Sequence, residues 1–345
     1  MAKVQARSEA VRRFILERVE KHPTDIASIT SEKFNITRQA VNKHLQKLIG
    51  EGALLQKGNT RSRSYQLVSL NTFHKIYLLA EILEEDRIWR EDIATLLGTI
   101  PQNVLDIWHY GFTEMFNNAI DHSEGKKISV YLNKTAVTTE IIIHDDGIGI
   151  FKKIQKALDL IDERHSVLEL AKGKLTTDPS RHTGEGIFFA SRMFDDFNIL
   201  SGGIYFSHQF DEEEDWIFER EKLSSGTSVW MLLNNHTART TKKVFDKFSS
   251  GEDYGFTKTV VPVKLVQYGD ENLISRSQAK RLLARIDRFE TVIFDFQGVV
   301  LIGQSFADEI FRVFAKQHPT MKLLDIKANS AVKKMIGRAR SGLEF

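Results

Sequence analysis

Hydrophobic residues recur at steps of three and four along the first 50 residues, the spacing that predicts α-helices. Three helices are expected: VRRFILERVEKH with Ser8 as its cap, then IASITSEKF, then RQAVNKHLQKLIGEG with its end at Gly52. The segment ALLQKGNTRSRSYQLV is typical of two strands joined by a basic turn. We therefore predict a small three-helix unit with a hairpin over residues 1–70.

Residues 71–100 also show a helical spacing, because Phe73, Ile76, Ala80 and Leu83 are three or four apart. This pattern predicts a helical connector between the first unit and the rest of the chain. Its apolar seam could pack on neighbouring parts of the chain or against a second copy, so a homodimer is one arrangement that it allows.

Residues 101–235 combine a helix over YGFTEMFNNAIDH with strand-like segments KISVYLNK and TTEIIIHDDGIGI. A second helix, IFFASRMF, and a last strand that begins near Gly226-Thr227 in SSGTSVWMLL complete this region. Residues 236–345 alternate strand and helix patterns, which predicts a small α/β domain. The fold class expected for the whole chain is therefore multidomain α+β.

The composition agrees with a soluble protein, since 41% of the 345 residues are hydrophobic and 27% are charged. At roughly 100–200 residues per domain, the length predicts two or three domains. No apolar run approaches the roughly 20 residues of a membrane helix, and the first residues do not resemble a signal peptide. We expect a cytoplasmic location and no membrane association. The absence of cysteine excludes disulfides and thiolate metal sites.

Charge is unevenly distributed, because residues 1–70 contain 13 Lys/Arg and 6 Asp/Glu, a net charge of +7 in a chain of +2. A basic unit on a weakly acidic body suggests a polyanionic partner. In the third helix Thr37 is the expected cap. The side chains able to contact bases and phosphates there and in the hairpin turn are Arg38, Gln39, Asn42, Lys43, Lys57, Arg61 and Arg63. His44 points outward with them.

This basic helix and hairpin resemble the winged helix-turn-helix domains of bacterial transcription regulators. The resemblance covers about 65 residues and implies that residues 1–70 bind double-stranded DNA, with Arg38 to His44 in the major groove. The alternative is a small helical domain that contacts other proteins.

Glu114 and Asn118 are four residues apart and therefore share one face of their helix, beside the apolar Met115 and Ala119. A carboxylate can accept a proton, and a carboxamide oxygen can ligate a hard cation such as magnesium. Asp145, at the end of an apolar strand, is followed by Gly147 and Gly149, which let the backbone turn where a side chain would obstruct a ligand.

Two further glycines, Gly184 and Gly186, open the helix IFFASRMF, where exposed N–H groups would suit a phosphate. Taken in order, these motifs resemble the GHKL ATPases, whose Bergerat fold is an α/β sandwich with a mixed sheet. The resemblance spans about 130 residues and implies that ATP and Mg²⁺ bind at residues 101–235. It assigns magnesium to Asn118, adenine to Asp145 with Thr227 nearby, the adenine-side turn to Gly147 and Gly149, and the phosphates to Gly184 and Gly186.

Residues 163–183 correspond to a lid over ATP in this resemblance. Lys172, Lys174, Arg181 and His182 would then either reach phosphate or serve as ordinary surface charges. Asp146 is expected to be a solvated acid. Glu114 is interpreted as a catalytic general base on water or a hydroxyl group, because the GHKL ATPases and the anti-sigma serine kinases have an acid there. The alternative is a glutamate that only pairs with a neighbouring cation.

The segment VIFDFQGVVLIGQSFADEIF resembles the STAS domains of anti-sigma antagonists, in which a serine at the start of a helix is phosphorylated by a partner kinase. Ser305 has the matching position, but Gly303-Gln304 replaces the usual Asp-Ser before it. Ser305 is therefore either a phosphoacceptor or a helix cap, with Asp308 three residues later.

The expected organisation is a winged helix at 1–70, a helical connector at 71–100, a GHKL ATP-binding domain at 101–235 and a STAS-like domain at 236–345. The expected function is an ATP-binding transcription regulator with Mg-dependent ATPase activity. Two alternatives remain: a serine/threonine kinase that acts on its own or a partner's STAS domain, and a non-catalytic nucleotide-sensing scaffold.

Overall fold

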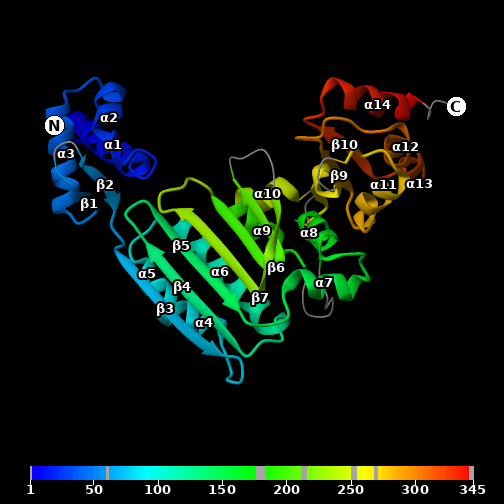
Figure 1. The fold of residues 1–345 in the computed structure, drawn as a ribbon, viewed down its shortest axis with the longest axis horizontal. Helices are drawn as coiled ribbons and strands as arrows, with labels where there is room; N and C mark the ends of the chain where they lie inside the picture. Colours follow the sequence, from blue (N-terminus) through cyan, green and yellow to red (C-terminus); the bar gives the residue numbers. More distant parts are fainter. Residues whose placement is uncertain are drawn as a thin grey trace.

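The computed structural model describes residues 2–59, 62–175, 184–210, 216–249, 255–267 and 271–341. These residues form three units in chain order, and the two termini lie at opposite ends of the molecule (Figure 1). Among the residues described, none of the helices combines the length and the apolar composition that crossing a bilayer requires.

The N-terminal unit has three helices, α1 (Ala2–Arg18), α2 (Ile26–Phe34) and α3 (Arg38–Gly50), and an antiparallel hairpin of β1 (Leu54–Lys57) and β2 (Ser64–Leu67). It has a hydrophobic core of its own. Thr37 caps α3 as predicted, because its Oγ1 accepts a hydrogen bond from the backbone N–H of Ala40. Ser8 is not a cap: α1 begins at Ala2, since the residues before Ser8 are good helix formers and extend the helix.

The central unit contains a five-stranded sheet in the order β3-β4-β5-β7-β6. Its strands are β3 (Asn71–Leu78), β4 (Lys127–Lys134), β5 (Thr138–Asp145), β6 (Asp196–Gln209) and β7 (Trp216–Asn234). A mixed sheet was predicted, but every described pairing in this sheet is antiparallel, and the parallel pairings are in the C-terminal unit.

The strand β3 corrects the prediction of a helical connector. Residues 71–78 pair along their whole length with β4, so that Phe73 lies opposite Leu132 and Tyr77 opposite Ile128. The spacing of Phe73 and Ile76 suggested a helix, but pairing with β4 outweighs that local pattern, as often happens for β-forming residues. The helical part of this region begins later, with α4 (Glu85–Ile88), the π-helical turn η2 (Trp89–Ile93) and α5 (Ala94–Leu97).

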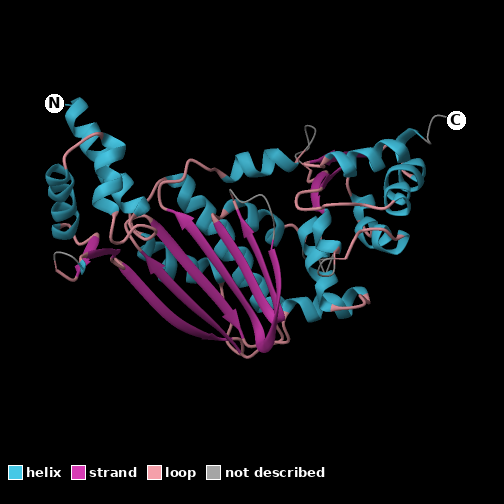
Figure 2. Ribbon diagram, turned by 45° about the horizontal axis from the view of Figure 1, so that its top comes forward, coloured by secondary structure: helices cyan, strands magenta, loops and turns pink. Residues whose placement is uncertain are grey.

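Helices cover one face of the central sheet (Figure 2). The longest of them, α6 (Gln102–His122), contacts β5 and β7, while α9 (Gly186–Met193) contacts β6. The remaining helices of the unit are α7 (Ile150–Leu158), α8 (Glu163–Lys172) and α10 (Thr241–Phe248).

The C-terminal unit alternates strands and helices as predicted. Its parallel sheet has the order β10-β9-β8, with β8 (Lys258–Pro262), β9 (Thr291–Asp295) and β10 (Lys322–Ile326). Its helices are α11 (Arg276–Leu283), α12 (Gln304–Asp308), α13 (Ala315–Gln317) and α14 (Ser330–Ser341), with the π-helical turn η5 (Glu309–Phe314) between α12 and α13. Unlike the N-terminal unit, it shares one continuous hydrophobic core with the central unit.

Candidate functional site

A cavity of about 290 Å³ lies in the central unit, with walls from α6, α7, α8, α9, β5 and β7. It brings together six residues that the sequence singled out, from segments up to more than 100 residues apart. These are Glu114, Asn118, Asp145, Gly184, Gly186 and Thr227. Gly147 and Gly149 are not among the lining residues; they lie in the segment that follows Asp145.

The helix α6 places Glu114 and Asn118 at the cavity because its apolar residues fix its rotation. Trp108, Phe112 and Phe116 are fully buried against the sheet. Glu114 and Asn118 lie on the flank of this apolar face and are half-buried. Their four-residue spacing puts both side chains in the same cavity wall, one helical turn apart.

Asp145 ends β5 and is 5% exposed. Its Oδ1 accepts hydrogen bonds from the backbone N–H groups of Gly147 at 2.9 Å and Thr227 at 3.2 Å. Burial raises the pKa of Asp145, and these two bonds oppose that rise. Because a carboxylate offers about four acceptor positions, Oδ2 can still accept a donor from a ligand.

The turn after β5 needs small residues because the chain passes very close to itself. A Cβ on Gly147 would lie 1.9 Å from the backbone oxygen of Ser123, and one on Gly226 would lie 1.8 Å from that of Asp145. Gly226-Thr227 was predicted to begin the last strand, but β7 begins at Trp216, so this pair lies inside a long hairpin with β6. The register shift beside Gly202 marks the same irregular region.

We expect Gly147→Ala to destabilise the ligand-free protein by about 2–3 kcal/mol, because the obstructing atom is backbone and must move. Gly337→Ala in α14 is the control, since a Cβ there meets nothing within 4 Å. That substitution is expected to stabilise the helix by about 0.5–1 kcal/mol. Urea unfolding monitored by circular dichroism measures both effects, and equal midpoints for the two variants would contradict the account of this turn.

Gly184 and Gly186 also line the cavity, just before and at the start of α9. Gly184 has a φ of +73° and its carbonyl accepts a hydrogen bond from the N–H of Leu175 at 3.0 Å. A Cβ on Gly186 would lie 1.9 Å from the carboxylate of Glu114. The start of α9 is therefore in direct reach of the predicted base.

From the sequence, no role was predicted for the other residues that complete the cavity. They include Ile143, Ile150, Ile154, Leu170, Leu175, Ile187, Phe188, Val229, His122, Ser123 and Lys153. Lys153 donates a hydrogen bond to the carbonyl of His122 at 2.8 Å and pairs with Glu124 at 3.1 Å. For Ile150, Lys153 and Ile154, the sequence offered only the spacing of apolar residues after Gly149. That spacing is typical of a helix but does not show which face of the helix a ligand would contact.

The two lysines of the predicted lid do not line the cavity. Lys172 is 1% exposed and donates to Glu169 at 2.8 Å, so it is neither a phosphate contact nor a surface charge. Lys174 donates to the carbonyl of Arg288 and lies over the ring of Phe289. Both lysines are turned toward the C-terminal unit. Arg181 and His182 lie outside the described residues.

Asp146 is a structural acceptor as well as a partly exposed acid. Its Oδ1 accepts hydrogen bonds from the N–H groups of Lys126 and Lys127 at 2.7 and 3.0 Å. Burial would raise the pKa of Asp146, but these bonds outweigh that effect and lower it. Asp146 therefore fixes the start of β4 and does not line the cavity.

The donor set fits a nucleotide-borne magnesium ion better than a protein-held one. Within the described ranges there is no group of three or more acidic, histidine or cysteine side chains able to hold a metal. Asn118 supplies one oxygen in the cavity. Mg²⁺ is commonly held by one or two protein oxygens together with phosphates and waters, so Asn118 would hold it only with a nucleotide present.

The predicted nucleic-acid contacts lie on one helix and one hairpin of the N-terminal unit. Arg38, Gln39, Lys43 and Lys57 are exposed, while Asn42 and Arg63 are half-buried. Arg38 donates to the hydroxyl of Ser28 at 3.1 Å. His44 is half-buried, and burial, with Arg12 and Lys47 nearby, lowers its pKa. Arg61 lies outside the described residues.

Ser305 is not a helix cap. The N-cap of α12 is Gly303, so Ser305 lies in the first turn, where it is exposed. Asp308 does not form a capping box either, because its carboxylate pairs with Arg312 at 3.1 Å. In Figure 1, α12 lies within the C-terminal unit, away from α6.

A comparison with known protein families matches part of the C-terminal unit. Residues 278–333, from α11 to α14, match the family model of a STAS-like domain of unknown function. The search of curated proteins returned no match to the chain. The chain is thus a multidomain α/β protein with a STAS-like domain near its C-terminus.

Proposed function

We propose that this protein is an ATP-binding transcription regulator, in which a GHKL-type domain controls a DNA-binding winged helix and the STAS-like domain. One observation carries the proposal: a single cavity collects Glu114, Asn118, Asp145, Gly184, Gly186 and Thr227. In the GHKL resemblance these are the positions of the base, the magnesium ligand, the adenine contacts and the phosphate contacts. Four separate motifs would have little reason to converge on one cavity if each were only a local turn signal.

The physical fit supports adenine at the β5 end and phosphates near α9. Asp145 offers a buried acceptor for an exocyclic amine, next to apolar side chains that would cover a flat ring. The N-terminus of α9 offers backbone N–H groups and the positive end of the helix dipole. Glu114 faces the start of this helix, where a carboxylate could orient water or a hydroxyl group.

Titration of the protein with ATP and ADP, with and without Mg²⁺, tests this assignment. Binding that depends on the adenine base and that strengthens with Mg²⁺ for ATP supports it. GTP is the matched competitor, since it presents a carbonyl in place of the exocyclic amine. If the protein does not bind ATP at millimolar nucleotide concentration, the proposal is wrong.

A salt-dependent DNA interaction is expected from the N-terminal unit. Lys57→Ala and Arg63→Ala should each weaken binding to all duplex sequences, and should reduce the slope of log affinity against log salt by about one unit. Lys316→Ala in the C-terminal unit is the control, because it removes an exposed cation far along the chain. Fluorescence anisotropy at several salt concentrations measures the slopes, and unchanged slopes in both hairpin variants would rule out the phosphate contacts.

A serine/threonine kinase of the anti-sigma type is the second candidate, because Ser305 is exposed within the STAS-like domain. A phosphate there would lie at the start of α12, where the helix N-terminus favours it, but close to Asp308, which opposes it. ATP labelled at the γ-phosphate separates the two functions, since an ATPase releases the label and a kinase leaves it on protein. A scaffold that only senses nucleotide would do neither.

A further inference from the structure

The helix α8 belongs to the cavity and to the junction with the STAS-like domain at the same time. Leu170 in its last turn and Leu175 just after it line the cavity. The same helix contacts β8, the 3₁₀ turn η3 (Val263–Val266) and α9. Every residue from His165 to Lys172 is buried, so this part of α8 is packed on all sides and cannot shift without moving its neighbours.

At the C-terminal end of α8, the central and C-terminal units exchange hydrogen bonds: each unit donates to carbonyls at the end of a helix in the other. Lys172 Nζ donates to the carbonyls of Arg281 and Ala284 at 3.2 and 2.8 Å, at the C-terminal end of α11, where a helix runs out of donors for its last carbonyls. In return, the hydroxyl of Thr259 in β8 donates to the carbonyl of Lys172 at 2.6 Å. Helix ends favour a cation at such carbonyls, so this exchange fixes α8 to both β8 and α11.

The charge of Lys172 is balanced inside the junction. Glu169 accepts from Lys172 at 2.8 Å and lies 3.5 Å from Arg285, which follows α11. Separating a buried pair leaves an uncompensated charge, which is strongly unfavourable. The end of α8 and the end of α11 are therefore expected to move together.

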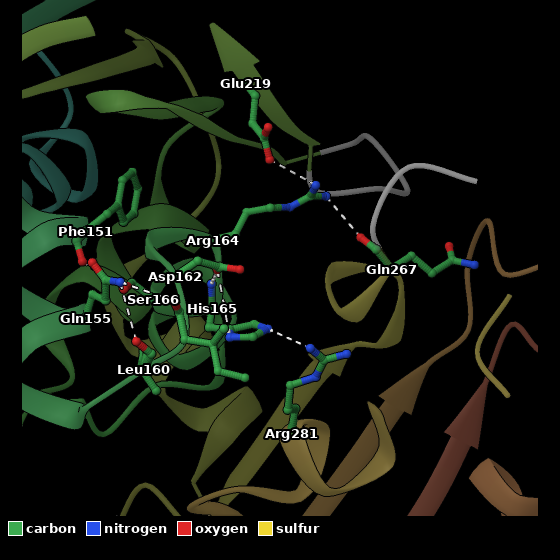
Figure 3. A network of polar contacts seen from close by, with 11 residues as sticks. Phe151, Gln155, Leu160, Asp162, Arg164, His165, Ser166, Glu219, Gln267 and Arg281 are labelled. Carbon is green, nitrogen blue, oxygen red and sulfur yellow. Dashed lines mark hydrogen bonds and ion pairs between the residues drawn. The ribbon is translucent and has the colours of Figure 1, made fainter. Parts of the chain in front are cut away.

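The first turn of α8 repeats this bridging arrangement (Figure 3). Arg164 pairs with Glu219 of β7 at 3.1 Å and donates to the carbonyl of Gln267 at 3.0 Å, after η3. His165 lies 3.3 Å from Arg281 of α11. Contacts to the C-terminal unit thus occur at both ends of the helix.

An apolar contact links the same junction to the cavity wall. A Cβ on Gly173 would lie 2.7 Å from the ring of Phe256 and 3.0 Å from that of Phe188. Phe188 lines the cavity, and its ring packs on Phe256 with centroids 4.6 Å apart. A displacement of Phe188 in the cavity wall would therefore press directly on Phe256, at the start of the C-terminal unit.

We infer that α8 couples occupancy of the cavity to the STAS-like domain, with Lys172 and Thr259 as the connecting contacts. This inference rests on the proposed nucleotide site. Filling the cavity restrains Leu170 and Leu175, and the capping exchange transmits that restraint to α11 and β8. Coupling of this kind is reciprocal, so a partner that binds the STAS-like domain would change nucleotide affinity by the same factor.

Hydrogen–deuterium exchange with a non-hydrolysable ATP analogue and Mg²⁺ tests the coupling in the full chain. Bound analogue is expected to slow exchange in α11 by at least threefold. Thr259→Val removes the hydroxyl donor at nearly constant volume, and Glu169→Leu with Lys172→Met removes the buried charges together. Both variants are expected to bind the analogue and to lose the slowing in α11.

Thr139→Val is the matched control, because Thr139 is equally buried and donates to Asn235 in the central unit at 2.7 Å. It should retain the slowing in α11. If the wild-type protein binds the analogue but α11 exchanges at its original rate, the coupling is refuted while the nucleotide site stands. Persistence of the slowing in both junction variants refutes it equally, whereas a wild-type protein that does not bind the analogue removes the proposed function itself.

Discussion

Asp145→Asn is expected to weaken the binding of adenine nucleotides by about 100-fold or more. Asn keeps an oxygen that can accept the hydrogen bonds from Gly147 and Thr227, so the turn should persist. The other carboxylate oxygen becomes an NH₂ donor, which would face the exocyclic amine of adenine. Losing a charge-assisted bond costs about 1.5–3 kcal/mol and leaving a buried donor unpaired costs about 1–3 kcal/mol, while 1.4 kcal/mol corresponds to tenfold in affinity.

Asp146→Asn is the control for this substitution, because it makes the same chemical change one residue later. Its carboxylate accepts from Lys126 and Lys127 and does not line the cavity. Affinity in this variant should remain within about threefold of wild type. Calorimetric titration of both variants with nucleotide measures the two affinities. If both variants lose affinity equally, Asp145 acts through its charge and not through contact with adenine.

Ligand-free Asp145→Asn should also respond differently to pH. Burial raises the pKa of Asp145 in the folded protein above its unfolded value, so the folded state binds the proton more tightly. Its contribution to stability is therefore present at low pH and is lost as pH rises from the unfolded pKa through the folded one. The asparagine in the variant cannot ionise, so the free energy of unfolding of the variant should not show this loss.

Several polar residues that line the cavity could be predicted because each depends on local geometry. Glu114 and Asn118 are adjacent on any helix that spans them, and Asp145 follows a strand whose apolar residues identify it. A strand end and a helix flank are positions that short patterns define well. The sequence could not reveal the apolar lining, since Leu170 and Phe188 look like any other core residues.

Long-range contacts explain where the sequence-based predictions were wrong. β3 has a helix-like spacing and becomes a strand only because β4 is available as its partner. Lys172 was interpreted as a surface or phosphate-binding cation, and only the position of α11 shows that it is buried. Ser305 is not a cap because the N-cap of α12 is Gly303, two residues before Ser305. Each of these outcomes depends on a partner or a boundary that the local pattern does not contain.

Glu114→Gln is expected to lower ATP turnover by about 10²–10⁴-fold, the range in which a positioned general base contributes. Gln has nearly the same shape and can keep hydrogen bonds, but it cannot take a proton at neutral pH. Affinity for ATP should remain within about tenfold, since the substitution removes a negative charge near the proposed phosphate position and no proposed ligand contact. A loss in turnover with retained binding is the signature of a group that acts in the transition state.

Asp106→Asn on the same helix is the control, because Asp106 is exposed two turns earlier and bonds to Gln102. It should leave turnover unchanged. With γ-labelled ATP, Glu114→Gln should reduce both released phosphate and any label on Ser305, because a hydroxyl group would need the same base as water. Turnover that survives the loss of the carboxylate would instead assign Glu114 to a structural role, a side chain that holds the start of α9 in place, where Gly186 leaves room for it.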